Sequence, residues 1–224
     1  MASTASPTVT TPPAQAAEPT PLLTRLEKYR KPLTWGFGLL AVIAVGAWLW
    51  SETGRRKASA AADALDVARA TFEAGNLPGA SAAFQRVIQA YNGTDAAFQA
   101  ELGLNAVRLA SGQAQLAIDE LRKFAGASPP AYYASGAYLM MGAALENLRK
   151  FDDAAAAYVK AGDIAEEGYR KVDGLLGAAR AFGLAGKQKE ELDVLRRIVS
   201  KFPEGTTGVP EAKVRLAELT QGAM

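Results

Sequence analysis

Cysteine and histidine are both absent from this chain of 224 residues. Without cysteine there are no disulfides and no thiolate nucleophiles. Without histidine as well there are no imidazole bases and almost no zinc, copper or haem sites. We therefore expect no enzyme, no metal and no cofactor. The missing thiols leave the redox compartment open, because such a chain suits the cytosol and the periplasm equally.

The net charge is also small, +2, because the chain has 25 Lys and Arg residues and 23 Asp and Glu residues. These charges are unevenly distributed along the sequence. Residues 1–57 hold seven basic and three acidic residues, whereas residues 58–224 hold 18 basic and 20 acidic ones. The positive charge brackets one hydrophobic segment and does not form a basic face. We therefore expect no nucleic-acid partner.

The sequence has one long apolar run, from Leu33 to Trp50, in which all eighteen residues are uncharged. A helix of this length spans about 27 Å, close to the hydrocarbon thickness of a bilayer. Tryptophans lie at both ends, at Trp35, Trp48 and Trp50, where indole rings prefer the headgroup region. Residues 25–51 are thus predicted to form a basic juxtamembrane segment and one transmembrane helix.

Two other interpretations of this segment compete with a membrane anchor. A buried core helix seldom lacks a polar face. A cleaved signal peptide would use the small residues at Ala58 to Ala60, but the charged stretch SETGRRK separates them from the apolar run.

Four basic residues precede the span and three follow it, which favours a cytoplasmic amino terminus. We expect a single-pass protein of the bacterial inner membrane with its following domain in the periplasm.

The two segments that flank the anchor are predicted to lack regular structure. Residues 1–24 are rich in Ala, Thr and Pro and cannot bury enough apolar surface to fold, so they are predicted to be a disordered tail, with a docking arm as the alternative. Residues 52–60 are predicted to be a linker.

The remainder of the chain repeats with a period of 37 residues and no gaps. The copies are LPGASAAFQRV from Leu77, AQLAIDELRKF from Ala114, FDDAAAAYVKA from Phe151 and QKEELDVLRRI from Gln188. Their fourth position is Ala80, Ala117, Ala154 or Glu191, and their eighth is Phe84, Leu121, Tyr158 or Leu195. These spacings place a small and a large residue on one helical face. Each copy is predicted to be a second helix that packs on a first helix, with Ala154 near Gly142.

A glycine precedes three of the four copies by two residues, at Gly75, Gly112 and Gly186, and suits the left-handed conformation that ends a helix. With these turns the sequence resembles the tetratricopeptide repeat family. The period of 37, Arg149 in place of a turn glycine and Glu191 in place of a small residue depart from the family pattern. The resemblance implies an all-α, tetratricopeptide-like solenoid of helical pairs over residues 61–219. It includes a capping helix at Glu211 to Leu219 and is followed by a tail over 220–224.

The same resemblance implies a binding groove lined by the first helices of successive pairs, and the Lys/Asn pattern that clamps a terminal carboxylate is missing from it. A mostly apolar groove suits a nonpolar segment or a partner helix; packing within the superhelix is the alternative role for its residues. The aligned positions are Gln99, Leu102, Ala106, Leu139, Met140, Ala143, Glu146, Asn147, Asp173, Leu176 and Arg180.

The order of segments also resembles the single-pass ancillary subunit family of the SecYEG translocon. That resemblance implies the translocon or periplasmic folding factors as partners. We expect a membrane-anchored, non-catalytic scaffold that binds protein partners at the extracytoplasmic face. The alternative is a structural accessory or assembly subunit of a larger membrane complex, with Gly36, Gly38 and Gly46 making close helix contacts. The acidic pairs Asp152-Asp153 and Glu190-Glu191 are expected to complement helix dipoles.

Overall fold

The computed structural model describes the backbone of residues 30–220 and the side chains of residues 43–220. It divides the chain into two compact units, residues 1–53 and residues 54–224. The predicted tails over 1–24 and 220–224 lie outside the described residues, apart from Thr220.

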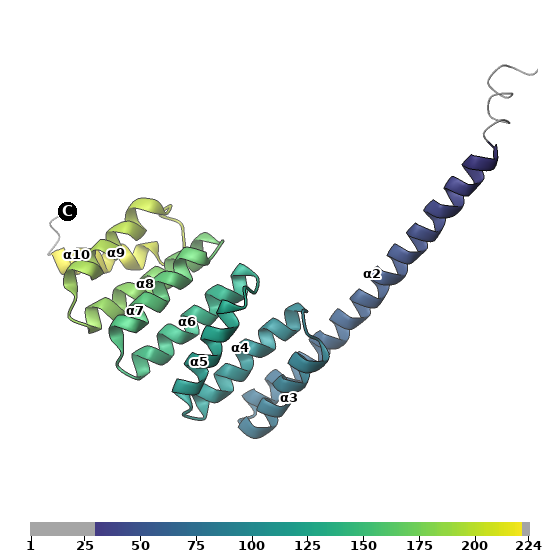
Figure 1. Cartoon of the computed structure of the whole chain (residues 1–224). Helices are drawn as coiled ribbons and strands as arrows, with labels where there is room; N and C mark the ends of the chain where they lie inside the picture. The colour runs from purple at the N-terminus through teal and green to yellow at the C-terminus, as the bar shows by residue number, and fades with distance from the viewer. Residues whose placement is uncertain (1–29, 221–224) are drawn as a thin grey trace, which may run out of the picture. The chain divides into compact units, whose positions relative to one another are not determined.

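The described residues form helices and no strand. Figure 1 shows α3 to α10 following one another from teal to yellow as a series of packed helices. The helices are α2 (Arg30–Glu73), α3 (Leu77–Ala90), α4 (Asp95–Ala110), α5 (Ala114–Gly126), α6 (Ala131–Asn147), α7 (Phe151–Ile164), α8 (Gly168–Leu184), α9 (Gln188–Lys201) and α10 (Val209–Thr220).

The 37-residue period is confirmed in the helix boundaries. The second helices α3, α5, α7 and α9 begin at the four residues where the sequence copies begin. The first helices end at Glu73, Ala110, Asn147 and Leu184, again 37 residues apart. The first of these is the carboxyl-terminal part of α2, and α10 is the predicted capping helix. The array is therefore four helical pairs followed by one unpaired helix.

Each pair is closed by one residue in the left-handed conformation. Gly75, Gly112 and Gly186 have φ of 77°, 75° and 74°, and Arg149 has φ of 57° at the third of the four turns. A side chain at such a φ is strained, which explains why three of the four turns use glycine. The guanidinium of Arg149 lies 5.5 Å from the centre of the Phe151 ring, a cation–π contact that offsets part of this strain.

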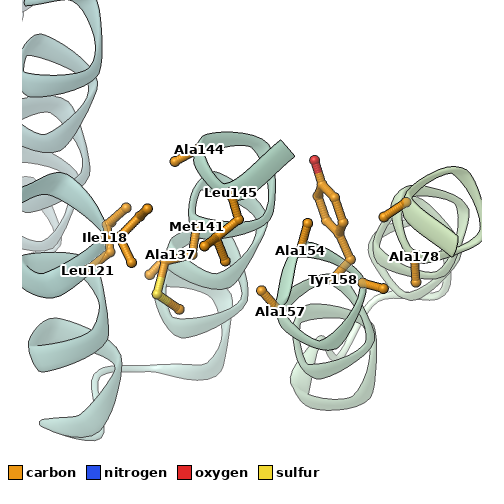
Figure 2. Packing of buried hydrophobic residues seen from close by; sticks show 12 residues of the cluster. Ile118, Leu121, Ala137, Met141, Ala144, Leu145, Ala154, Ala157, Tyr158 and Ala178 are labelled. Carbon is orange, nitrogen blue, oxygen red and sulfur yellow. The ribbon is translucent and has the colours of Figure 1, made fainter. Parts of the chain in front are cut away.

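The core lies between the helices as three successive clusters and not as one centre, as expected for stacked repeats. The fourth-position alanines Ala80, Ala117 and Ala154 are fully buried. Figure 2 shows the middle cluster, in which Ala154 and Tyr158 from α7 lie between α6 and Ala178 of α8. Small residues thus let neighbouring helices approach, and the eighth-position side chain fills the space that is left.

The two aromatic residues at the eighth position pack on glycines of neighbouring first helices. A β-carbon added to Gly103 would lie 2.5 Å from the Phe84 ring, and one added to Gly142 or Gly177 would lie 2.6 or 2.7 Å from the Tyr158 ring. The side chain nearest to a β-carbon at Gly142 would therefore be the ring of Tyr158. The sequence predicted Ala154 at this contact. At these two places the ring fits between the helices because the facing residue has no side chain.

Two predictions concern the residues that precede the repeats. Residues 52–60, predicted as a linker, lie inside the continuous helix α2. Within the described part of the chain, no helix is long and apolar enough to span a membrane. Most of the predicted span from Leu33 to Trp50 lies outside that part, because side chains are described only from Ile43 onward.

Candidate functional site

The predicted groove residues lie on three consecutive first helices, and none of them is buried. Helix α4 contacts α6, and α6 contacts α8, so these helices lie side by side as a groove requires. Helix α4 carries Gln99, Leu102 and Ala106; α6 carries Leu139, Met140, Ala143, Glu146 and Asn147; and α8 carries Asp173, Leu176 and Arg180. Their role in binding stays a prediction.

The apolar members of this set also serve the core. Leu102, Leu139 and Met140 are partly buried against the middle cluster, and Leu176 packs on the carboxyl-terminal one. Ala143, Asn147 and Arg180 are exposed. The same surface can therefore serve both packing and binding, because some of its side chains are half-buried against the core and others are exposed to a partner.

Two of the predicted residues, which lie 34 positions apart in sequence, form an ion pair. Arg180 donates from Nε to Oε1 of Glu146 at 3.1 Å and from Nη2 to Oε2 at 3.3 Å. The hydroxyl of Tyr158 donates to Oε2 of Glu146 at 3.2 Å and accepts from Nη2 of Arg180 at 3.2 Å. The network joins α6, α7 and α8 at one point, and it was not predicted.

Tyr158 was assigned to packing alone, but its hydroxyl reaches the groove residues. The signal available in the sequence is that tyrosine, unlike the phenylalanine at Phe84, brings a hydroxyl that needs a polar partner when buried. Burial, with a smaller effect from the Glu146 carboxylate, raises the pKa of Tyr158 to about 12. The fold therefore holds this phenol in its neutral form.

The raised pKa predicts a loss of stability in strong base. Because the folded pKa is above the ordinary value of 10.0, the stabilisation is complete below about pH 10 and is lost as the pH rises towards about 12. The melting temperature of the full-length protein should therefore fall more between about pH 9 and about pH 11.5 than that of Tyr158→Phe. Circular dichroism of both proteins in mild detergent measures this, and equal falls would show that the phenol does not contribute.

A second buried polar group lies in the last copy. Glu191 replaces the small fourth-position residue, yet it is buried, and it accepts a hydrogen bond from Nε of Arg215 on α10 at 2.8 Å. Gly183 of α8 makes room for it, because a β-carbon there would lie 2.8 Å from the Glu191 carboxylate. Asp152, Asp153 and Glu190 lie in first helical turns as predicted, but Glu191 has this additional role as the ionic link to the capping helix.

Chemistry is sparse along the groove. Gln99 accepts a hydrogen bond from Arg69 of the first helical pair. Among the residues that the structure describes, no group of three acidic side chains is placed to hold a metal ion. The surface offers apolar area and paired charges, which suit recognition of a polypeptide.

Comparisons with solved structures support the fold. Repeats of a protein from Podosopora anserina described as a kinesin light chain are 16% identical with a TM-score of 0.54, covering 71% of this chain and 84% of that one. The MamA protein is 18% identical with a TM-score of 0.50, covering 72% of this chain and 87% of that one. At such identities the likeness concerns the fold alone. No curated protein matches the sequence.

Family models agree with the arrangement of helical pairs. A model described as a tetratricopeptide repeat-like domain matches residues 26–157, which is more than half of the chain. A second, described as a tetratricopeptide repeat, matches residues 173–205. The period, the left-handed turns and the stacked helical pairs account for both matches, and the chain belongs to the tetratricopeptide repeat-like domain family.

Proposed function

We propose that this protein is a membrane-anchored, non-catalytic scaffold that binds protein partners in the groove of its helical repeats at the extracytoplasmic face. The observation that carries the proposal is the row of first helices α4, α6 and α8, whose unburied side chains combine apolar area with a fixed ion pair. A stacked array provides an extended surface for polypeptides.

The membrane part of the proposal is supported by the apolar segment before the repeats. Its described side chains, from Ile43 to Trp50, are all exposed, and they include two tryptophans, a leucine, an isoleucine and a valine. Apolar residues on every side of a helix need an apolar surrounding, which a bilayer supplies. The basic residues on both sides of the segment are typical of the ends of such spans.

The partner class follows from the same layout. The order of anchor and repeat domain resembles that of the ancillary translocon subunit family, so partners near the protein secretion machinery are part of the proposal. A permanent structural subunit of a membrane complex is the second candidate. It is favoured by Gly46, since a glycine in an apolar helix lets a second helix approach closely. Copurification without crosslinking would favour this second candidate.

Blocking the groove tests the scaffold directly. Ala143 is an exposed alanine on the first helix α6, whereas Ala156 is an exposed alanine on the second helix α7. We expect Ala143→Trp to reduce the partners recovered by crosslinking and pull-down about tenfold, because a bulky ring would occupy the groove. Ala156→Trp should recover them as the wild type does. Equal recovery by the two variants would place the binding surface elsewhere.

Topology is tested separately. We expect alkaline carbonate to leave the protein in the membrane, and protease added to spheroplasts to digest residues 58–224, because the positive charge before the span favours a cytoplasmic amino terminus. A cytoplasmic control protein must stay intact in the same sample. Protection of residues 58–224 would reverse the orientation, and extraction by carbonate would disprove the anchor.

A further inference from the structure

Sulfur is confined to methionine in this chain, because cysteine is absent. Thioethers are therefore the only sulfur groups that an oxidant can attack. The structure describes the side chains of Met140 and Met141, which are neighbours on α6. Met141 is 3% exposed within the middle cluster, whereas Met140 is half-buried against that cluster. Adjacent positions on one helix thus place one thioether inside the core and the other at its surface.

The repeat register shows what is particular to Met140. Its equivalents one repeat earlier and one repeat later are Gly103 and Gly177, and each of these glycines packs on an aromatic ring. In the gap of Met140 the eighth-position residue is Leu121, which has no ring. The long side chain on the first helix therefore takes up part of the volume that a ring takes up in the neighbouring gaps. Methionine suits such a place, because its rotatable bonds let it fill an irregular space.

Oxidation of Met140 would affect packing and the groove together. The side chain packs on the middle cluster, which contains residues of α5, α6, α7 and α8, and it also belongs to the predicted groove. A sulfoxide replaces the flexible apolar thioether with a polar, chiral group. A polar group that lies against an apolar cluster without a hydrogen-bond partner is destabilising. Oxidation at this one sulfur should therefore loosen the packing of α6 and make the groove more polar.

We propose that Met140 is a site of reversible oxidation by peroxides and that its oxidation weakens binding in the groove. The thioether sulfur attacks one oxygen of hydrogen peroxide, the O–O bond breaks and an S–O bond forms. The sulfur gives up an electron pair, and the displaced oxygen leaves as water. The modification needs no partner, and only its effect on binding rests on the proposed scaffold function. The extracytoplasmic face in that proposal is an oxidising environment.

Peptide mass spectrometry after treatment with hydrogen peroxide tests the site. In the full-length protein in mild detergent, we expect the sulfoxide of Met140 to form at least about tenfold faster than that of Met141, because Met141 reacts only when α6 opens. Fragment spectra distinguish the two adjacent residues. In denaturant both should react at the same rate, since neither is then protected by packing. Equal rates in the folded protein would overturn the proposal.

Thermal unfolding tests whether the oxidation loosens the array. We expect peroxide to lower the melting temperature of the wild-type protein and to leave that of Met140→Leu unchanged. Leucine has a similar volume and is apolar, so this variant should melt close to the wild type before treatment. Met141→Leu is the matched control, and peroxide should lower its melting temperature as it does for the wild type. A peroxide effect that persists in Met140→Leu, or none in the wild type, would contradict the proposal.

Reversal by enzymes tests the chemical nature of the change. The two methionine sulfoxide reductases, one for each sulfoxide epimer, should restore the melting temperature of the peroxide-treated wild type. The same treatment should remove the sulfoxide of Met140 from the mass spectra. A melting temperature that stays low after the sulfoxide has been removed would assign the loss of stability to another reaction and overturn the proposal.

Crosslinked pull-downs separate this inference from the proposed function, with each protein oxidised and freed of peroxide before partners are added. Loss of partners by the treated wild type, with recovery by treated Met140→Leu, supports both. Recovery of the same partners by treated and untreated wild type keeps the scaffold and overturns the effect of Met140 on binding. Loss of partners by both treated proteins means that peroxide acts at another residue and also overturns it. Recovery of no partner by the untreated protein refutes the scaffold, and the mass spectra and melting temperatures still decide the oxidation site.

Discussion

Replacing Gly174 with alanine is expected to destabilise the repeat domain by about 2 kcal/mol or more. A β-carbon at this position would lie 2.5 Å from the backbone nitrogen of Gly162, 2.8 Å from its Cα and 2.9 Å from the carbonyl oxygen of Tyr158. These are backbone atoms of α7, so they cannot rotate away as a side chain would. Helices α7 and α8 would have to separate, although together they hold Tyr158 and much of the middle cluster.

Gly126 provides the control for this substitution. It lies in the last turn of α5, and a β-carbon there would meet nothing within 4 Å. Alanine favours a helix over glycine by up to about 1 kcal/mol, so Gly126→Ala should be neutral or stabilising. The melting temperature of both variants, followed by circular dichroism, makes the comparison. If Gly174→Ala behaves like Gly126→Ala, the close crossing of α7 and α8 is not present in solution.

The second large effect is expected at Ala154, where leucine should lower the melting temperature clearly while the same change at Ala156 does not. Ala154 is fully buried in the middle cluster, beside Tyr158 (Figure 2), whereas Ala156 is exposed on the same helix. Close-packed interiors have no room for three more carbon atoms, and overpacking costs about 1–3 kcal/mol.

Thermal unfolding of the two leucine variants distinguishes a packed alanine from a helix-forming one. The alanines share helix α7 and nearly the same sequence surroundings, so helix propensity changes equally in both. A difference between them can therefore come only from burial. Small and equal shifts would mean that the repeat register places α7 wrongly against its neighbours.

Much of the fold was predictable because its signals are local. The helix starts at Leu77, Ala114, Phe151 and Gln188 follow from the period, and the left-handed turns follow from glycine. The burial of Ala154 and the exposure of Ala156 follow from helical geometry. Arg149 also adopts the left-handed conformation, although a side chain disfavours it. The period predicts this, because Arg149 is at the position equivalent to the three turn glycines.

The candidate site was predictable only as a face. The resemblance to tetratricopeptide repeats predicts that Glu146 and Arg180 line a groove on neighbouring first helices. It does not predict their ion pair, because the two residues lie 34 positions apart in the sequence. Nor could it add the Tyr158 hydroxyl from a second helix. The partner of Glu191 was equally hidden, since Arg215 comes from the capping helix, outside the four repeat copies.

The number of helical pairs, the starts of their second helices and the residues that face inward follow from local sequence patterns, since periodicity and turn conformation depend on neighbours within a few positions. The distances between helices depend on how the helices pack in three dimensions, and these distances set which charges meet and how the space between helices is filled. Tyr158 fills its gap because two glycines let α6 and α8 approach its ring, and Glu191 is accommodated in the last copy because Gly183 leaves room for its carboxylate and Arg215 of α10 pairs with it. Such volumes depend on residues from three helices at once, so they exist only after the helices have packed.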